Sequence, residues 1–142
     1  MPAFLLDVNV LIALAWPTHV HHRRARSWWD TAEEWATTPV TESAFVRLSI
    51  NPHVVGTPVT VPTALAMLAA IRATPGCRFV PDGASLTTPS IGLDRVATPG
   101  QITDVHLVNL AASTGLILAT LDAGILDMLA PDDRRHVLLL PR

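Results

Sequence analysis

The sequence predicts an α/β fold, a three-layer α/β/α sandwich around a central, mainly parallel sheet of four to five strands. Short apolar runs alternate along the chain with segments of helical periodicity, and twelve prolines lie at the borders of these segments. Such alternation is typical of a parallel sheet with helices packed on both faces. Because neither a repeat nor a linker interrupts the pattern, we expect residues 1–142 to form a single domain.

The first elements follow from one buried run and the residues that break it. Residues 4–6 (Phe-Leu-Leu) are expected to form a short buried strand, and a helix over residues 9–15 is expected to stop at Pro17. Thr18 then suits the N-cap of a longer helix that runs to about residue 34.

The alternation continues through the middle of the chain. Residues 35–38 are expected to form the second strand. Thr41 is expected to cap a helix that ends before Pro52, because the residue before a proline disfavours helical geometry. Pro62 suits the first turn of the next helix, over residues 63–73.

The third strand is expected at residues 77–80. The segment 81–100 is rich in Pro, Gly, Ser and Thr, which favours a loop, with one short helix around residues 91–96. Thr103 is expected to cap a helix that begins at Asp104 and closes at a glycine, residue 115.

The last elements are strand, short helix and strand. Residues 116–119 (Leu-Ile-Leu-Ala) form a continuous apolar run, as in a strand buried on both faces. A short helix over residues 123–129 and a final strand over residues 136–140 complete the expected sheet.

The composition excludes several classes of protein. With 49% apolar residues the chain can bury a core, and its single cysteine, Cys77, cannot form an internal disulfide. Asp7 and Asn9 interrupt the most apolar stretch, so we expect no membrane association and a cytoplasmic location. The net charge of −2 gives no general attraction for nucleic acid. Only 15% of residues are charged, which predicts an apolar surface covered by a partner.

Four carboxylates lie where the strands of a parallel sheet are expected to end. Asp7 and Asp122 follow strands, and Glu42 and Asp104 lie in the first turns of helices. Because ligands bind at the carboxyl ends of parallel strands, we expect the four side chains to converge there. Four like charges repel one another, and a hard cation such as Mg²⁺ or Mn²⁺ relieves that repulsion. For each acid alone, a helix cap or a first-turn charge is the alternative.

Two polar residues extend this acidic pattern. Asn9 lies two residues after Asp7, and Thr120 lies two residues before Asp122, so in extended chain each shares a side with its acid. We expect Asn9 and Thr120 to orient the carboxylates or water at the metal. Ordinary turn contacts are the alternative.

Four segments resemble the motifs of the PIN-domain family, in the same order. They are Leu-Leu-Asp-Val-Asn at residues 5–9, Thr-Glu-Ser at 41–43, Thr-Asp-Val-His at 103–106 and Leu-Ala-Thr-Leu-Asp-Ala-Gly at 118–124. The set spans nearly the whole chain and is most similar to the VapC toxins of toxin–antitoxin pairs.

The resemblance implies an endoribonuclease that hydrolyses RNA phosphodiester bonds with Mg²⁺ or Mn²⁺. The catalytic and metal-binding residues that it implies are Asp7, Glu42, Asp104 and Asp122. It also implies a homodimer that is inhibited by a small VapB-type antitoxin. The helices that carry Trp28, Trp29 and Arg47 are the candidate groove for an amphipathic segment of that partner. Neither the RNA that is cleaved nor the number of bound ions follows from the sequence.

Arginines on two of the expected helices are candidates for contacts with RNA. They are Arg23, Arg24, Arg26 and Arg47. Arginine binds phosphate groups, and the tryptophans that follow the first three suit base stacking. A solvated helix face is the alternative for these three, and a surface ion pair is the alternative for Arg47.

Two other functions stay open at this point. A haloacid-dehalogenase-like phosphohydrolase also carries an aspartate after its first strand, but it needs a lysine, and all ten basic residues of this chain are arginines. A non-catalytic partner-binding module would keep the fold and the apolar surface, but it has no need for the four acids.

Overall fold

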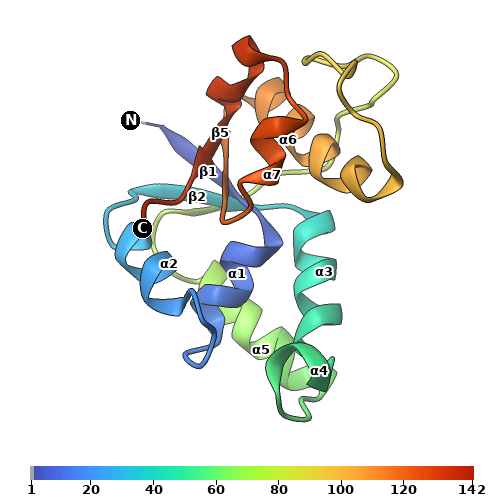
Figure 1. Ribbon diagram of the computed structural model, residues 1–142. Coiled ribbons are helices and arrows are strands. Elements are labelled where there is room, and N and C mark those ends of the chain that lie inside the picture. The colour runs from blue at the N-terminus through green and yellow to red at the C-terminus, as the bar shows by residue number, and fades with distance from the viewer. Residues whose placement is uncertain (1) are drawn as a thin grey trace.

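A computed structural model describes residues 2–142 and contains a five-stranded sheet in the order β3-β2-β1-β4-β5 (Figure 1). The strands are β1 (Ala3–Leu6), β2 (Glu34–Thr37), β3 (Cys77–Phe79), β4 (Ile117–Thr120) and β5 (Val137–Leu139). All four neighbouring pairs are parallel. The predicted fold class is therefore confirmed, and the sheet has the larger of the two expected numbers of strands.

Helices connect consecutive strands and lie on both faces of the sheet. They are α1 (Val8–Ala15), α2 (His22–Trp29), α3 (Pro39–Ser49), α4 (Pro52–Val55), α5 (Val61–Arg72), α6 (Ile102–Thr114) and α7 (Gly124–Asp127), with 3-10 turns η1 (Pro99–Gln101) and η2 (Pro131–His136). Figure 1 shows α1, α3 and α5 on one side of the sheet and α6 on the other.

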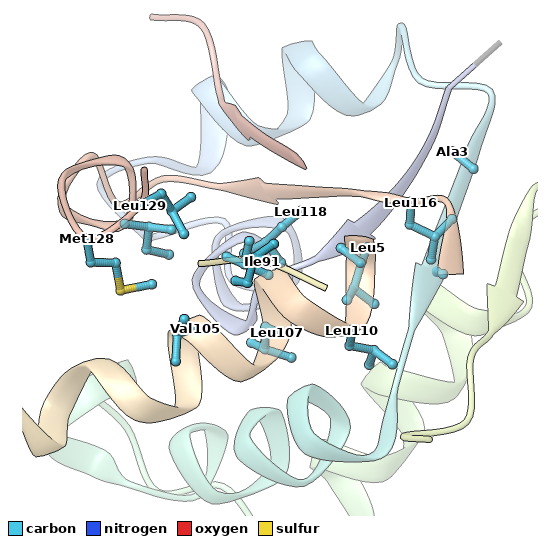
Figure 2. Packing of buried hydrophobic residues seen from close by; sticks show 14 residues of the cluster. Ala3, Leu5, Ile91, Val105, Leu107, Leu110, Leu116, Leu118, Met128 and Leu129 are labelled. Carbon is cyan, nitrogen blue, oxygen red and sulfur yellow. The ribbon is translucent and has the colours of Figure 1, made fainter. Parts of the chain in front are cut away.

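Alternating strand residues divide the core into two clusters, one on each face. Leu5 and Leu118 pack against the apolar face of α6, including Leu107 and Leu110 (Figure 2). The adjacent residues on the same strands, among them Leu6, face the opposite way and pack against α1, α2, α3 and α5. Because successive side chains of a strand point to opposite faces, short central strands suffice to hold both helix layers.

The long helix expected from Thr18 to residue 34 is wrong. Residues 17–21 form turns, and α2 covers only His22–Trp29. Nδ1 of His19 accepts a hydrogen bond from the backbone N–H of His21 at 3.0 Å, and this local contact competes with helical geometry. At the other end, the Thr31 hydroxyl donates to the carbonyl of Trp28 at 2.6 Å, and the chain leaves the helix.

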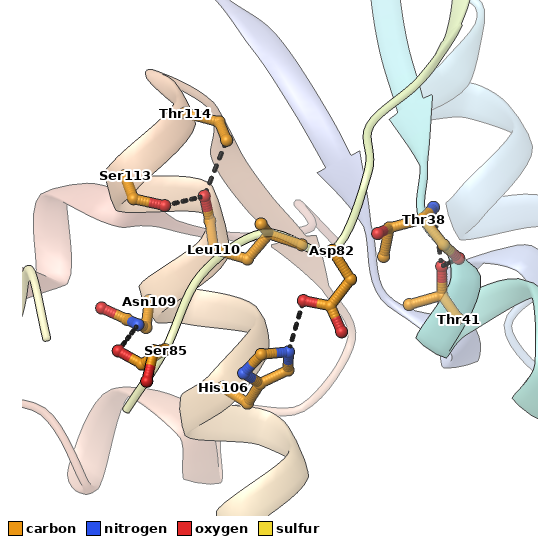
Figure 3. A network of polar contacts seen from close by, with 9 residues as sticks. All are labelled: Thr38, Thr41, Asp82, Ser85, His106, Asn109, Leu110, Ser113 and Thr114. Atoms are coloured by element: carbon orange, nitrogen blue, oxygen red, sulfur yellow. Dashed lines mark hydrogen bonds and ion pairs between the residues drawn. The ribbon is translucent and has the colours of Figure 1, made fainter. Parts of the chain in front are cut away.

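The helix that carries Glu42 begins three residues earlier than expected. Thr38 is the N-cap of α3, and Pro39 occupies the first helical position, which suits its fixed φ. Thr41 lies one turn inside the helix, where its hydroxyl accepts from the Thr38 N–H at 3.4 Å and donates to the Thr38 carbonyl at 3.1 Å (Figure 3). Glu42 nevertheless stays in the first turn.

Other boundaries move for similar reasons. Residues 91–96 form bends and turns, so the short helix expected there is wrong. Thr98 begins a 3-10 turn that leads into α6 at Ile102, which displaces Thr103 from the expected cap position. Gly115 ends α6 as expected, with a φ of 72° that favours glycine. The helix α4 follows Asn51, whose side chain accepts from the N–H of His53 at 3.0 Å, and was not predicted.

Over residues 2–142, none of the helices combines the length and apolarity needed to span a membrane.

Candidate active site

The carboxyl edge of the sheet positions the acidic residues. Asp7 follows β1 directly and is the N-cap of α1, and Asp122 follows β4. Asp104 lies in the first turn of α6, and Glu42 lies in the first turn of α3, just after β2. The topology thus delivers four carboxylates from separate segments to neighbouring points of one edge.

Asp7 is held rigidly by short hydrogen bonds and is only 3% exposed. Its Oδ1 accepts from the backbone N–H of Val8 at 2.7 Å. Its Oδ2 accepts from the Thr120 hydroxyl at 2.8 Å and from the Asn9 amide at 3.3 Å. Oδ1 therefore has a donor from the start of α1, Oδ2 has donors from β4 and α1, and none of these donors carries a positive charge.

Asn9 and Thr120 connect the ends of β1 and β4. The Asn9 amide donates to Thr120 Oγ1 at 3.2 Å, and its carbonyl oxygen accepts from the N–H of Leu121 at 3.1 Å. Thr120 Oγ1 in turn accepts from the N–H of Asp122 at 3.1 Å. The buried Thr120 hydroxyl thus touches the side chain of Asp7 and fixes the backbone of Asp122.

Three aspartates influence one another through their negative charges. We call Asp7, Asp104 and Asp122 the aspartate cluster. Burial raises the pKa of Asp7 to about 6, and the charges of Asp104 and Asp122 add to the rise. The hydrogen bonds from Thr120 and Val8 oppose it. Burial, and then the charge of Asp122, also raises the pKa of Asp104. The cluster is therefore a site of uncompensated negative charge.

Glu42 has different surroundings. Its Oε2 accepts from the buried Thr37 hydroxyl at 2.6 Å, and the same oxygen lies 3.5 Å from Nε of Arg72. The guanidinium carbon of Arg72 lies 5.0 Å from the centre of the Phe79 ring. Glu42 is not among the charges that shift the pKa of Asp7. The structure therefore gathers three of the four expected acids and holds the fourth in an ion pair.

The aspartate cluster suits a hard cation by its chemistry. In the described part of the chain, residues 2–142, no three His, Cys, Asp or Glu side chains stand close enough together to enclose an ion. Asp104 is half-buried, and Asp122 is exposed with its Oδ1 accepting from the N–H of Gly124 at 2.9 Å, whereas Asp7 is buried and fixed. An oxygen-only donor set with net negative charge fits Mg²⁺ or Mn²⁺. Closing the site around the ion requires side-chain rotation.

Sequence reasoning missed two residues of this edge, Thr37 and Arg72. Thr37 ends β2 as Thr120 ends β4, and each donates its hydroxyl to a carboxylate. The position of a hydroxyl at a strand end was therefore a usable signal for Thr37. No comparable signal marks Arg72, because its partner lies on another helix, thirty positions earlier in the sequence.

The arginines expected to contact RNA differ in their surroundings. Arg24 donates hydrogen bonds to the carbonyls of Leu140 and Pro141. Arg26 lies 3.4 Å from Asp30 and stacks over a neighbouring indole. Arg23 and Arg47 are exposed, and neither forms an ion pair within the described chain.

The segment after β3 is tied to α6 beside the site. Asp82 Oδ1 lies 2.8 Å from Nε2 of His106, one turn from the start of α6 (Figure 3). The buried Asn109 accepts from the N–H of Ser90 at 2.7 Å and donates to the Ser85 carbonyl at 3.4 Å. These contacts fix one border of the acidic edge.

Comparison with known proteins places this geometry in a family. Residues 4–129 match the family described as PIN domain. Ribonuclease VapC38 of Mycobacterium tuberculosis is 41% identical over 138 residues, which cover 96% of each chain. Ribonuclease VapC39 of the same species is 46% identical over 126 residues, covering 87% of this chain and 91% of that one. The fold resembles the crystal structure of M. tuberculosis VapC20, a Sarcin-Ricin loop cleaving toxin, with a TM-score of 0.60 and 16% identity over 86% of this chain and 92% of that one.

Proposed function

This chain belongs to the PIN domain family, and we propose that it is a metal-dependent endoribonuclease, the toxin of a VapBC-type toxin–antitoxin pair. Its relatives named as ribonucleases support the activity on RNA. The observation that carries the metal dependence is the aspartate cluster, where Asp7 is buried beside two like charges and its donors among the described residues 2–142 are uncharged. A divalent cation is the natural counter-charge for such a site.

In this proposal Asp7, Asp104 and Asp122 hold Mg²⁺ or Mn²⁺, and Glu42 completes the site from α3. When bound, the ion supplies polarisation of a phosphoryl oxygen and activation of water for in-line hydrolysis. Asp7 is the fixed member, because its hydrogen bonds leave it little freedom. Asp104 and Asp122 adjust around it.

Thr120 and Asn9 serve as positioning residues in this scheme. The Thr120 hydroxyl orients the Asp7 carboxylate and, through the backbone of Asp122, the next acid of the site. Asn9 supports both Asp7 and Thr120. Contacts of this kind tune a metal site without touching the ion.

Exposed arginines are the proposed RNA contacts. Arg47 lies on the helix that carries Glu42, and Arg23 lies on the exposed side of α2. Arg24 and Arg26 remain candidates, although each already has a partner within the chain. Salt-dependent binding of RNA is the expected signature of these residues.

A VapB-type antitoxin is the proposed partner, and hollows on both sides of α2 support its binding there. One, of about 490 Å³, is bordered by Arg23, Trp28 and Pro141, and the other, of about 340 Å³, is bordered by Trp29 and Met67. A segment with apolar and acidic side chains complements these indoles and arginines. The expected groove combined the Trp28 and Trp29 helix with the Arg47 helix. Both hollows border the first of these helices, and neither is bordered by Arg47.

A homodimer is also proposed, and an apolar surface between the end of α3 and the middle of α5 supports it. The exposed residues there are Ile50, Val54, Val61 and Leu65. Surfaces of this kind are commonly covered in assemblies. Sedimentation at micromolar concentration tests this, and a parent protein that stays monomeric contradicts it.

The test of the enzymatic proposal is cleavage of total cellular RNA with Mn²⁺, followed by mapping of new RNA ends. We expect Asp7→Asn, Glu42→Gln, Asp104→Asn and Asp122→Asn each to lose cleavage while they keep the fold. Asp94→Asn removes an exposed carboxylate of the loop before α6 and serves as the matched control. Full activity of the parent in EDTA contradicts the metal requirement, and parent protein that neither binds Mn²⁺ nor cleaves RNA favours a partner-binding module.

A further inference from the structure

Arg72, the last residue of α5, contacts two groups at the carboxyl edge of the sheet. Its Nε lies 3.5 Å from Oε2 of Glu42, and its guanidinium carbon lies 5.0 Å from the centre of the Phe79 ring. The side chain of Arg72 is 45% exposed, whereas that of Glu42 is only 17% exposed. Arg72 is therefore the more exposed partner of the ion pair, and its guanidinium lies over the ring of Phe79.

The ion pair occupies the oxygen that Thr37 also contacts. Glu42 Oε2 accepts from the Thr37 hydroxyl at 2.6 Å and faces Arg72 as well. Thr37 is buried at the end of β2, so the carboxylate has one fixed hydroxyl donor and one cationic side chain at the same oxygen. A divalent ion that approaches this carboxylate meets a positive charge already in place, and the two cations repel each other.

Glu42 has a counter-charge of its own and stands apart from the aspartate cluster. Glu42 is absent from the charges that raise the pKa of Asp7, whereas Asp104 and Asp122 are present among them. An acid that has its own counter-charge has less need of a metal ion than Asp7 has.

We propose that Arg72 is a positioning residue that competes with the divalent cation for Glu42, so that completing the metal site requires displacement of Arg72 from this carboxylate. The inference rests on the proposed metal-dependent function. Its consequence is a lower affinity for the ion than four unpaired acids would give. Release of Glu42 becomes part of the free-energy cost of metal binding.

Calorimetric titration of the full chain with Mn²⁺ tests the competition, because it needs no RNA. We expect Arg72→Gln to bind Mn²⁺ more tightly than the parent by about two- to fivefold, the range for a partly exposed ion pair. Arg78→Gln is the matched control, since it removes the same charge from the neighbouring edge strand at an exposed residue that forms no ion pair within residues 2–142. We expect this control to bind Mn²⁺ as the parent does.

The Glu42→Gln background shows whether the effect passes through Glu42. In that background, Arg72→Gln is expected to change the Mn²⁺ affinity no more than Arg78→Gln does. Phe79→Leu provides a second variant that keeps all charges and weakens only the support of Arg72, and a smaller gain in affinity is expected from it.

The outcomes separate this inference from the proposed function. If Glu42→Gln weakens Mn²⁺ binding but Arg72→Gln does not strengthen it, the competition is overturned and the metal site stands. A gain that persists in the Glu42→Gln background also overturns the competition, because it reflects general charge. If Glu42→Gln leaves the affinity unchanged, Glu42 is not a ligand and the inference fails with that assignment. A parent that binds no Mn²⁺ overturns both proposals.

Discussion

At one edge of the sheet, the carboxylates of two neighbouring parts differ in whether a positively charged side chain pairs with them. At the ends of β1 and β4, Asp7 lies beside two other aspartates, and its donors within residues 2–142 are all uncharged. At the end of β2, Glu42 has a hydroxyl donor of the same kind and an arginine in addition. The two carboxylates lie at the same edge of the sheet, but only Glu42 has a counter-charge within residues 2–142.

This difference shows that the fold determines where the acids lie, whereas the neighbouring side chains determine whether their charge is balanced. The parallel sheet brings every strand end to one edge, whether the acids there are paired or not. The pKa of Asp7, raised to about 6 by burial and by its acidic neighbours, shows the cost of leaving a carboxylate unpaired. The aspartate cluster is therefore the part of the edge that gains most from a cation.

The largest expected effect is on cleavage when Asp7 is neutralised. Asp7→Asn is expected to lower the rate of Mn²⁺-dependent RNA cleavage by at least about a thousandfold, equivalent to about 4 kcal/mol of transition-state stabilisation. The measurement is the initial rate of cleavage of total RNA, with Asp94→Asn as the control. Near-parental cleavage by Asp7→Asn would remove the fixed carboxylate from the site and break the comparison.

The second prediction concerns stability without metal. The pKa of Asp7 is 3.8 in the reference state and about 6 in the folded protein, so folding favours the protonated form. The destabilisation from this group is therefore fully present above pH 6, is relieved as the pH falls through 6, and is absent below 3.8. At pH 7 it amounts to about 3 kcal/mol of unfolding free energy.

Urea unfolding of the parent and of Asp7→Asn in EDTA, between pH 7 and pH 4, measures this effect. The unfolding free energy of the parent, minus that of the variant, should rise by about 2 kcal/mol as the pH falls across this range. Taking the difference cancels the titration of the other groups. At pH 7, Mn²⁺ should stabilise the parent more than Asp7→Asn. A pH-independent difference would show that Asp7 titrates normally.

A third prediction tests Thr120 as the support of the unpaired acid. Thr120→Val removes the hydroxyl donor of Asp7 but keeps the shape of the buried side chain. Because that donor lowers the pKa of Asp7, its loss should raise this pKa further and lower cleavage by about tenfold or more. Thr120→Ser retains the donor and should recover most of the rate. The pH profile of cleavage should move toward higher pH in Thr120→Val only.

The smallest effect on cleavage is expected from Thr37→Val, the corresponding substitution beside Glu42, which has an ion-pair partner. Thr37→Val removes the hydroxyl that donates to Glu42 at 2.6 Å, but Arg72 remains next to the same oxygen. We expect a loss of cleavage below about tenfold, since the ion pair still positions Glu42. Equal losses in Thr37→Val and Thr120→Val, measured side by side, would contradict the difference between the two parts of the edge.

The strands and the acidic edge could be predicted because their signals are local. Apolar runs at residues 4–6 and 116–119 mark buried strands, and the acids follow such runs or open the next helix. Parallel topology then brings these ends together without further information. Gly115 likewise marked the end of α6, where its positive φ is needed.

The remaining features depend on contacts that local patterns do not contain. The Glu42–Arg72 pair exists only because α5 packs beside α3, and spacing along the chain does not indicate that packing. The turns around His19 replaced an expected helix because a side chain bonded to a nearby backbone N–H. Ion pairs between distant helices and side-chain contacts with the local backbone are therefore features that the hydrophobic periodicity of this sequence does not predict.

The two edge strands of the sheet, β3 and β5, limit backbone pairing between copies of this chain. β3 and β5 have three residues each, and a proline follows soon after each of them, at Pro81 and Pro141. At the end of β5, Arg24 donates hydrogen bonds to the carbonyls of Leu140 and Pro141. Short margins of this kind, interrupted by proline and occupied by a side chain, offer little backbone for a strand of another molecule to pair with. The homodimer proposed above is therefore expected to form through helix surfaces rather than through the edges of the sheet.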